Sequence, residues 1–366
     1  MAETSIGTGS SLAQKAWRPA LCHEAERQAH MLSFVGSKND SCIVQLDDLT
    51  KKRGDTVQVR FSPTDDTHDG FGESDTIRGN EQSITFQKDE LKINWLGEAY
   101  AQSSQMSQQR VNFDLKKAAF YKLSAWWARR WEEAILAQLA GYLPSNSGIY
   151  KRAGMNAIPE VDDNHHVWAA GAASYTDDQT QAGDSTALMT LDLLNDCVLK
   201  AMSKAHLSYP IPVASDGYYH VVMHPEQWLQ LRRDTSSGEW QDIELSRIKG
   251  SEGYKSSGIA RGMLGIYNNI KLHVSDYIPK GVHSSADTAV SNTRRAVFLG
   301  AKAAHMAFGE GYAGGQHLDW VEQIDDYRRW GVLADSVFGV KTTIFPNTSG
   351  TDEYYGSLVV STYSAN

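Results

Sequence analysis

Residues 113–140 read FDLKKAAFYKLSAWWARRWEEAILAQLA, and large apolar side chains recur in this run every three or four residues. The recurring side chains are Phe120, Leu123, Trp127, Trp131, Ile135 and Leu139. This spacing is typical of a long helix that buries one face. Asn112 is the predicted N-cap and Gly141 the predicted end, so at ~1.5 Å per residue the helix is roughly 40 Å long.

The stretch before this helix, from Gly54 to about Tyr100, alternates polar and apolar residues and carries no catalytic motif. Residues 55–61 alternate cleanly, and the alternation returns in residues 83–87 and 91–95, on either side of Lys88–Asp89. We therefore expect an extended β-hairpin with a turn at Lys88–Asp89 and a long polar excursion. A segment that cannot bury both faces in its own domain needs another molecule to cover it, which indicates assembly rather than catalysis.

The rest of the chain predicts further helices and, after them, mostly strands. Residues 1 to about 13 are small and polar, as in a flexible arm. Helices are expected in residues 13–34, in residues 190–205 and after His224–Pro225. The expected strands are residues 44–46, 218–223, 270–275, 295–308 (strand or short helix), 332–344 and 357–361. Helices early and strands late favour an α+β fold over an alternating parallel sheet.

Composition bounds the function further. The chain has 366 residues and a formal net charge of −9. This charge argues against a protein that binds nucleic acid by neutralising its phosphates. It does not exclude a protein that encloses a polyanion without binding it tightly. Its three cysteines are widely spaced, so neither a disulfide framework nor a CxxC metal site is expected, and a reducing compartment fits best. No signal peptide or membrane span is visible, so we expect a soluble protein.

Titratable clusters offer a second hypothesis, a soluble metal-assisted hydrolase that uses the Asp/His loops around His68 or His165. Solvated acidic loops are far more common than metal sites. His220 and His224 lie in or at the end of a strand, about 13 Å apart at ~3.3 Å per residue, too far to share one ion. Cys22 and His23 are adjacent on a helix and point in different directions. We therefore assign no catalytic, cofactor-binding or metal-binding residue and no cofactor, and expect the chain not to be an enzyme.

Several strings, in their order along nearly the whole chain, resemble the major capsid proteins of tailed bacteriophages, in particular the family related to the N4 phage capsid protein, which has the HK97 fold. These strings are Val44–Leu49 with Lys52 and Gly54–Asp55, Gln109–Arg110 with Phe113–Leu115, Tyr219–Pro225 with Leu231–Asp234, Arg295–Ala301, and Asp326–Tyr327 with Gly331 and Phe338–Lys341. Residues 143–184 and 237–263 match no motif of that family.

The resemblance implies an α+β HK97-like capsid fold with five segments. They are an N-terminal arm in residues 1–45, an extended loop formed by a β-hairpin in residues 46–105, and a peripheral domain with the long spine helix in residues 106–185. An axial domain follows in residues 186–300, and residues 301–366 return to the peripheral domain.

The same resemblance implies a major capsid protein that self-assembles into hexamers and pentamers of an icosahedral shell. Such a shell would enclose double-stranded DNA without sequence-specific binding and be assembled in the bacterial host cytoplasm, with no membrane involved. Scaffolding, portal and decoration proteins are further implied partners. An encapsulin-like compartment shell is an alternative: it would assemble through the same kind of subunit contacts but enclose a different cargo. The sequence identifies no Lys–Asn pair for an isopeptide crosslink, so none is expected.

Combining the hairpin with this resemblance predicts the contact between subunits. Phe86, Ile93 and Trp95 are expected to cover a neighbouring subunit. Lys88, Asp89, Glu90 and Lys92, at the expected tip, are expected to set the register by charge pairing.

Overall fold

The computed structural model describes residues 21–46, 54–61, 71–73, 76, 78, 86–101, 109–112, 114–141, 156–170, 177–204, 206–233, 263–283, 288–309, 317–325, 329–346 and 350–364. The expected arm up to residue 20, most of the excursion after residue 61, the loop around His68 and residues 142–155 and 234–262 lie outside the described residues. Among the helices that are described, none is long and apolar enough to cross a membrane.

The long helix α3 (Leu115–Leu139) is the spine of the molecule. Its predicted apolar face is buried, and Trp127 and Trp131 are both 0% exposed. The N-cap is Asp114 rather than the predicted Asn112, because the Asp114 side chain accepts from the backbone N–H groups of Lys116 and Lys117. At the other end Gly141 adopts φ +60°, where an added Cβ would lie 2.4 Å from Val161 Cγ2.

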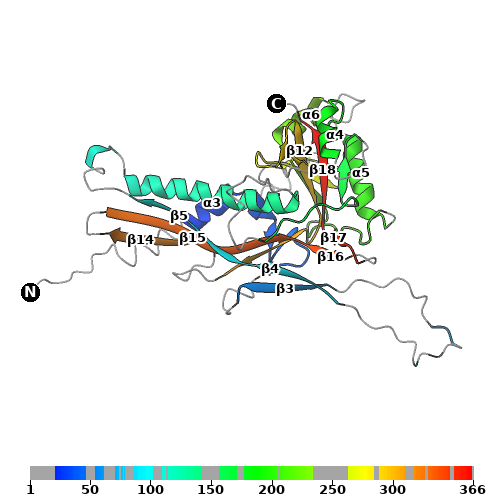
Figure 1. The fold of residues 1–366 in the computed structure, drawn as a ribbon, viewed down its shortest axis with the longest axis horizontal. Coiled ribbons are helices and arrows are strands. Elements are labelled where there is room, and N and C mark those ends of the chain that lie inside the picture. The colour runs from blue at the N-terminus through cyan, green and yellow to red at the C-terminus, as the bar shows by residue number, and fades with distance from the viewer. Residues whose placement is uncertain are drawn as a thin grey trace, which may run out of the picture.

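A six-stranded sheet lies against α3 (Figure 1). Its strands are β1 (Val35–Gly36), β2 (Ile43–Leu46), β13 (Ala304–Phe308), β15 (Arg329–Thr342), β14 (Asp319–Asp325) and β5 (Asn94–Ala101). The 14-residue strand β15 organises it, because β15 pairs antiparallel with β5, β13 and β14. The main apolar core of the protein lies between this sheet and α3.

A second six-stranded sheet has the order β6-β18-β12-β7-β9-β8 and forms the upright domain in Figure 1. These strands are β6 (His166–Trp168), β18 (Ser357–Tyr363), β12 (Thr293–Leu299), β7 (Tyr219–Met223), β9 (Ile270–Val274) and β8 (Met263–Tyr267). The helices of this domain are α4 (Asp177–Gly183), α5 (Leu191–Met202) and α6 (Pro225–Arg233). Every residue of β7 is buried, as expected for a strand covered on both faces.

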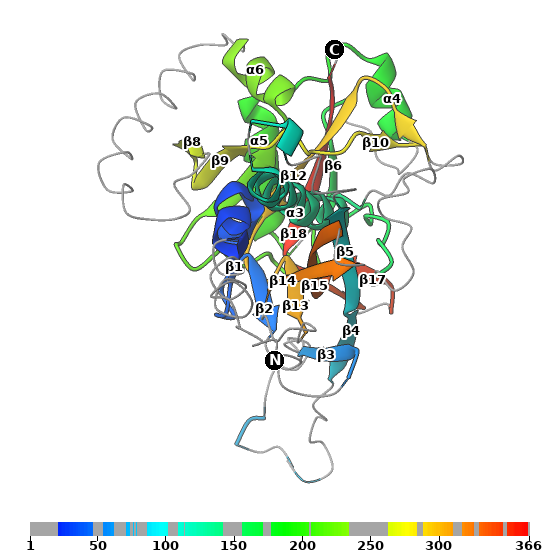
Figure 2. The same ribbon diagram turned by 90° about the vertical axis from the view of Figure 1, so that its left-hand side faces the viewer.

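Figure 2, which looks along α3, places β2, β13 and β15 of the first sheet below the helix and α5, α6 and β9 above it. Residues 21–28 are helical and lead through η1 (Met31–Phe34) into β1. Three two-stranded ladders complete the fold: β3 (Thr56–Phe61) with β4 (Gln87–Lys92), β10 (Gly281–Val282) with β11 (Ala289–Val290), and β16 (Ile344–Pro346) with β17 (Asp352–Tyr354).

The α+β architecture agrees with the sequence prediction, with two differences in the strands. Residues 295–308 form two strands, β12 and β13, which belong to different sheets. The last strand, β18, pairs with β12 of the second sheet and not with the sheet under α3. The expected domain boundaries themselves stay a prediction.

Candidate assembly surface

The predicted hairpin is formed by β3 and β4, which pair antiparallel from Thr56 opposite Lys92 to Phe61 opposite Gln87. Residues 62–86 connect the two strands, and therefore Lys88 and Asp89 are not a turn. They lie inside β4, opposite Arg60 and Val59. The prediction of a turn there was wrong because Lys88–Asp89 is a polar pair flanked by alternating residues, and an exposed strand edge produces the same pattern.

Alternation along β4 divides the predicted contact residues into two groups. Phe86, Lys88, Glu90 and Lys92 are exposed, whereas the residues between them are partly or fully buried. Residues directly opposite in the ladder share a face, so the exposed Gln58 and Arg60 of β3 join them. We call these six side chains the outer face of the hairpin: Gln58, Arg60, Phe86, Lys88, Glu90 and Lys92.

Asp89 and Ile93 point the other way, toward their own subunit. The Asp89 carboxylate forms an ion pair with Lys341 of β15. Ile93 packs on a small apolar cluster formed by Val57, Leu91 and Ala307. These two residues therefore anchor the hairpin within the subunit, and their expected contact with a neighbouring subunit stays a prediction.

Further contacts hold the base of the hairpin. The Asn156 side chain donates to the Lys92 carbonyl at 2.9 Å and to the Val340 carbonyl at 3.1 Å, and its own carbonyl accepts from the Lys92 N–H at 2.9 Å. At the far end of β3, the ring of Phe61 stacks on Phe345 with 4.6 Å between centroids. The described part of the hairpin is thus held to its own subunit at both ends.

Trp95, the last predicted contact residue, lies on β5 and is 53% exposed. Its indole N–H donates to Asp335 at 2.7 Å. The ring lies over Gly97, where an added Cβ would be 2.9 Å from the Trp95 Cζ2 atom. Phe86 is 69% exposed, so two large aromatic side chains near the hairpin are turned to solvent.

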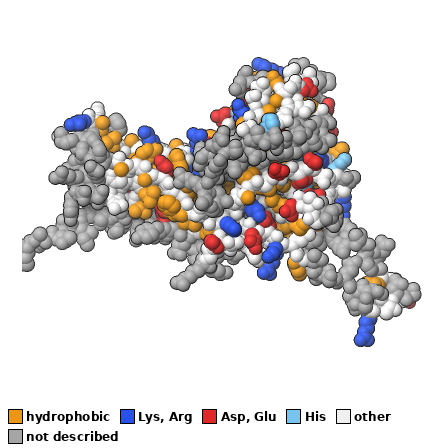
Figure 3. All heavy atoms as spheres, viewed as in Figure 1, with side chains coloured by type: hydrophobic (Ala, Val, Ile, Leu, Met, Phe, Trp, Pro, Cys, Tyr) orange, Lys and Arg blue, Asp and Glu red, His pale blue; other side chains and the backbone are white. Residues whose placement is uncertain are grey.

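Charged side chains of both signs alternate over the part of the surface where β3 and β4 lie (Figure 3). Lys88 and Glu90 approach each other at 3.8 Å, with more than two fifths of each side chain exposed. Gln58 donates to Glu90 at 3.2 Å across the ladder. These weak exposed contacts leave the charged groups free to re-pair with another molecule.

Sequence reasoning missed a second exposed apolar area, on α5. The spacing of Leu191, Leu194, Val198 and Met202 predicts that they share the buried face of this helix, but Met202 is 60% exposed, and Leu199 is 61% exposed. The helix begins at the N-cap Thr190, and its buried face is formed by Leu191, Leu194, Cys197, Val198 and Ala201. The presence of Leu199 outside the predicted apolar stripe was the available signal.

The Asp and His side chains in the loop around His165 make contacts that stabilise the fold. Asp162 accepts from His165 Nδ1 at 2.8 Å and, through its other oxygen, from the Tyr354 N–H at 3.0 Å. His166 contacts Ser361 at 2.6 Å and stacks on Trp168. Burial, reinforced by Arg295, lowers the pKa of His166 to about 3. A neutral, enclosed imidazole and a fully engaged carboxylate do not form a hydrolytic site.

His220 and His224 also belong to separate groups, as expected from their spacing on a strand. His220 lies 3.1 Å from His273 and 3.1 Å from Asp216, whereas His224 lies 3.2 Å from Asp276. Among the residues that the structure describes, three metal-ligating side chains converge at Cys22, Glu26 and His317. None of the predicted contact residues belongs to that group.

Comparison with solved structures identifies the fold. The chain is similar to the capsid of Ralstonia phage GP4, with a TM-score of 0.78, 23% identity, and coverage of 100% of this chain and 99% of that chain. It is also similar to the cyanophage Pam1 capsid, with a TM-score of 0.64, 18% identity and 93% of each chain covered. The head of Helicobacter pylori bacteriophage KHP40 matches with a TM-score of 0.60, 13% identity, and coverage of 92% of this chain and 91% of that chain.

No curated protein matches the chain in sequence. A sequence profile of a family described as phage capsid protein matches residues 5–366. The chain therefore belongs to the phage capsid protein family and has the HK97-like capsid fold: it is the major capsid protein of a tailed phage, a structural subunit of the icosahedral virion shell and not an enzyme.

Proposed function

We propose that the copies of this capsid protein assemble into hexamers and pentamers in which each β3–β4 hairpin lies over the neighbouring subunit. The contact is head-to-tail: the outer face of one hairpin meets a different surface of the next copy, so the chain of contacts closes into a ring. Rings of six and five copies then tile the shell.

The observation that carries this proposal is the division of β4 into two sides. Asp89 and Ile93 hold the strand to its own subunit, while Phe86, Lys88 and Glu90 are exposed to solvent. A strand with one anchored and one uncovered face is suited to a partner. Phe86 and Trp95 supply the apolar area, since aromatic side chains bury ~150–250 Å² each at interfaces.

Charge supports a second copy as that partner. The outer face of the hairpin carries Arg60, Lys88 and Lys92 against the single carboxylate of Glu90, whereas the whole chain has a net charge of −9. Arg60 and Lys88 lie directly opposite each other in the ladder, an arrangement that is unfavourable in an isolated subunit. An acidic surface on the neighbouring copy relieves this repulsion and sets the register.

Two variants test the hairpin contact by sedimentation velocity and electron microscopy. Phe86→Ser removes the apolar group, and the double variant Lys88→Glu with Lys92→Glu reverses the charge of the outer face. Both alter exposed side chains, so the subunit should fold normally by circular dichroism. We expect both to remain monomers or small oligomers under conditions in which the unaltered protein forms shells.

The control is Lys38→Glu, which reverses an exposed lysine in a turn away from the hairpin. This variant should assemble like the unaltered protein. Shells of normal size and yield from both hairpin variants would contradict the proposed contact. Deleting the whole strand is a poorer test, because β4 also pairs with β3 and anchors it.

We further propose that the shell encloses double-stranded DNA without reading its sequence, and that scaffolding, portal and decoration proteins are further partners. The net negative charge supports weak repulsion between the shell and packaged DNA. Nuclease-protected nucleic acid in purified particles is the expected result. Protein cargo without DNA would instead favour the encapsulin-like alternative.

The relation to the N4 phage capsid protein also stays a proposal. It is supported by the order of the strings Val44–Leu49, Tyr219–Pro225 and Arg295–Ala301 along the chain. A superposition on an N4-type subunit tests it: the three strings should fall on equivalent strands with no insertion between β7 and α6. A different order of these elements would contradict the relation.

A further inference from the structure

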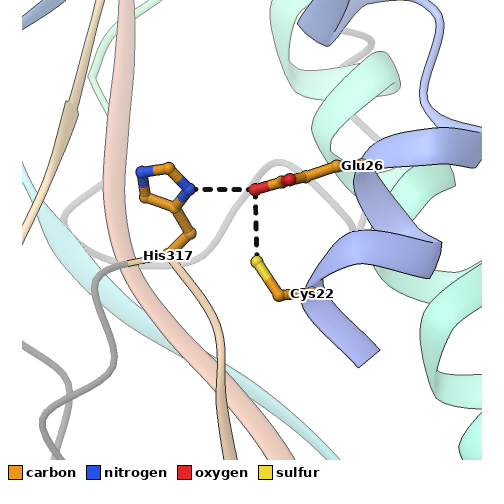
Figure 4. A group of neighbouring side chains, drawn as sticks. All are labelled: Cys22, Glu26 and His317. Carbon is orange, nitrogen blue, oxygen red and sulfur yellow. Dashed lines mark hydrogen bonds and ion pairs between the residues drawn. The ribbon is translucent and has the colours of Figure 1, made fainter. Parts of the chain in front are cut away.

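Three side chains with different metal-ligating atoms meet between the N-terminal helix and the start of β14 (Figure 4). Cys22 and Glu26 are one helical turn apart in residues 21–28, and the Cys22 thiol donates to Glu26 Oε1 at 3.2 Å. His317 comes from the other side, with its Nδ1 atom 3.0 Å from the same carboxylate oxygen. One atom from each residue lies within 4.8 Å of the other two.

The imidazole of His317 is held at both nitrogen atoms. Nδ1 faces Glu26, and Nε2 lies 3.5 Å from the Gln45 side-chain amide of β2. The amide nitrogen of Gln45 faces Nε2, and a flip of the amide that brings its oxygen to the ring lets Gln45 accept a hydrogen bond from Nε2–H, so that the lone pair of Nδ1 is available to a metal ion. This is the outer-shell arrangement that orients metal-binding histidines in proteins.

We propose that Cys22, Glu26 and His317 bind one Zn²⁺ ion per subunit. Thiolate, imidazole and carboxylate are all zinc ligands, and their combination favours zinc over magnesium or calcium, which prefer oxygen alone. The proposal is independent of the assembly contact, because none of the three residues lies on the outer face of the hairpin.

The geometry fits a tetrahedral ion with small side-chain movements. Bonds of ~2.3 Å to sulfur and ~2.0–2.1 Å to nitrogen and oxygen place neighbouring ligand atoms about 3.3–3.5 Å apart. The observed separations of 3.2 Å between sulfur and Oε1 and 3.0 Å between Nδ1 and Oε1 are slightly shorter. An ion entering between the three atoms needs to lengthen these two separations by a few tenths of an ångström, and the sulfur and the imidazole nitrogen lie within 4.8 Å of each other.

Access and the fourth ligand come from a neighbouring cleft. Glu26, Gln45 and His317 line a cleft of about 380 Å³ between the N-terminal helix and α3, whose wall also includes Trp131 and Phe308. A water molecule from this cleft completes the tetrahedron. On binding, the Cys22 S–H bond breaks, a sulfur–zinc bond forms and the thiol proton passes to solvent.

Such an ion would join two parts of the chain that are distant in sequence. Glu26 and His317 are 291 residues apart. The helix of residues 21–28 is the first described element, so the site ties this helix to the segment that leads into β14. Zinc would thereby stiffen this corner without taking part in any reaction.

Zinc content and cobalt substitution test the site on purified full-length protein. Elemental analysis after dialysis against a limited zinc excess should give about one zinc per subunit. Cobalt(II) loading should produce the thiolate-to-cobalt charge-transfer band in the near ultraviolet, together with intense visible bands typical of a tetrahedral ion. Cys22→Ala should abolish the charge-transfer band, and Gln45→Leu should weaken zinc binding by ~10–100-fold.

Matched controls separate this site from the other histidines and acids. His206→Gln removes an exposed histidine, and Glu24→Gln removes the neighbouring carboxylate of the same helix, which pairs with Arg27. Both controls should keep the full zinc content and the cobalt spectrum, whereas His317→Gln should lose both. A cobalt complex without a thiolate band in the unaltered protein, or undiminished zinc in Cys22→Ala and His317→Gln, would overturn the proposal.

Discussion

Arg295 lies fully buried where the C-terminal end of α3 meets the second sheet. Its guanidinium donates to the carbonyls of Ala140 and Gly141 at 3.0 and 3.1 Å, and to the Asp178 carboxylate through Nε at 2.9 Å. Burial alone raises the pKa of Asp178, but Arg295 and His166 outweigh it, so the net pKa lies below its ordinary value. The charge pair thus caps the spine helix and joins it to β12.

Removing one partner should be costly because it leaves a buried charge uncompensated. We expect Asp178→Ala to lower the free energy of unfolding by about 3–5 kcal/mol, measured by urea denaturation of unassembled subunits. Asp196→Ala, at an exposed position of α5, should change it by less than about 0.5 kcal/mol. Equal stability of the two variants would show that the buried pair contributes nothing.

Buried histidines predict loss of stability in mild acid. Burial is the largest cause that lowers the pKa of His166 to about 3 and that of His305 to about 4, from an ordinary value of 6.5. The unfolded chain therefore binds more protons than the folded chain below pH 6.5. Stability is full above that pH, falls through the window from 6.5 down to about 4 or 3, and is then constant for these groups.

The expected loss at pH 5.5 is about 1.4 kcal/mol for each of the two histidines relative to pH values well above 6.5. Unfolding by urea at pH 7.5 and 5.5 measures it. His305→Gln, which keeps a partner for Thr343, should lose roughly 1.4 kcal/mol less between these pH values than the unaltered protein. His206→Gln, at an exposed position, is the control and should show the unaltered loss. A His305→Gln variant with the unaltered pH dependence would contradict the assignment.

The spine helix allows the two candidate N-caps to be compared within one element. Asp114 accepts from the Lys116 N–H at 2.9 Å, whereas Asn112 is an exposed residue before the helix. Asp114→Ala should therefore lower the free energy of unfolding by ~1 kcal/mol, and Asn112→Ala should leave it nearly unchanged. Thermal or urea unfolding of the two variants decides between them, and the reverse order of stability would restore the sequence assignment.

Helices and strands could be predicted from the sequence where a single spacing of apolar residues dominates the segment. The apolar spacing of Phe120 to Leu139 gave the helix to within two residues at either end, because helix and buried face share one period. The strand β4 was misread because exposed strands resemble turns in composition, and its partner β3 is 25 residues away across the connecting excursion. Register across such a separation depends on tertiary packing against Lys341 and Ala307, which no local pattern contains.

Contacts between residues that are distant in sequence could not be predicted either, because they also depend on tertiary packing. Cys22 was compared with its neighbour His23, but the structure pairs it with Glu26 and brings His317 to them through the packing of β14 beside the N-terminal helix.

Which residues of α5 are buried and which are exposed was only partly predictable from the sequence. A leucine at position 199 fits the helix, and its exposure depends on where the second sheet ends.

At the scale of the whole molecule, a ring of identical subunits needs two different surfaces on each copy. We propose that the hairpin provides one, and that Leu199 and Met202, which are exposed on α5 in the domain built on the other sheet, provide the second. The two side chains are three residues apart and therefore adjacent on the helix. Full burial of such side chains contributes about 1.5–3 kcal/mol each, repeated at every subunit of a ring.

We therefore expect the double variant Leu199→Lys with Met202→Lys to fold normally but to fail to close rings, because two buried charges at each contact outweigh the remaining apolar area. Circular dichroism of the subunit and electron microscopy of the assembly reaction measure the two effects. Leu229→Lys, which changes a single exposed leucine on α6, is the matched control, since isolated exposed apolar residues are ordinary on protein surfaces. If the α5 variant formed shells as readily as this control, the second surface would have to lie elsewhere, whereas the hairpin contact would be unaffected.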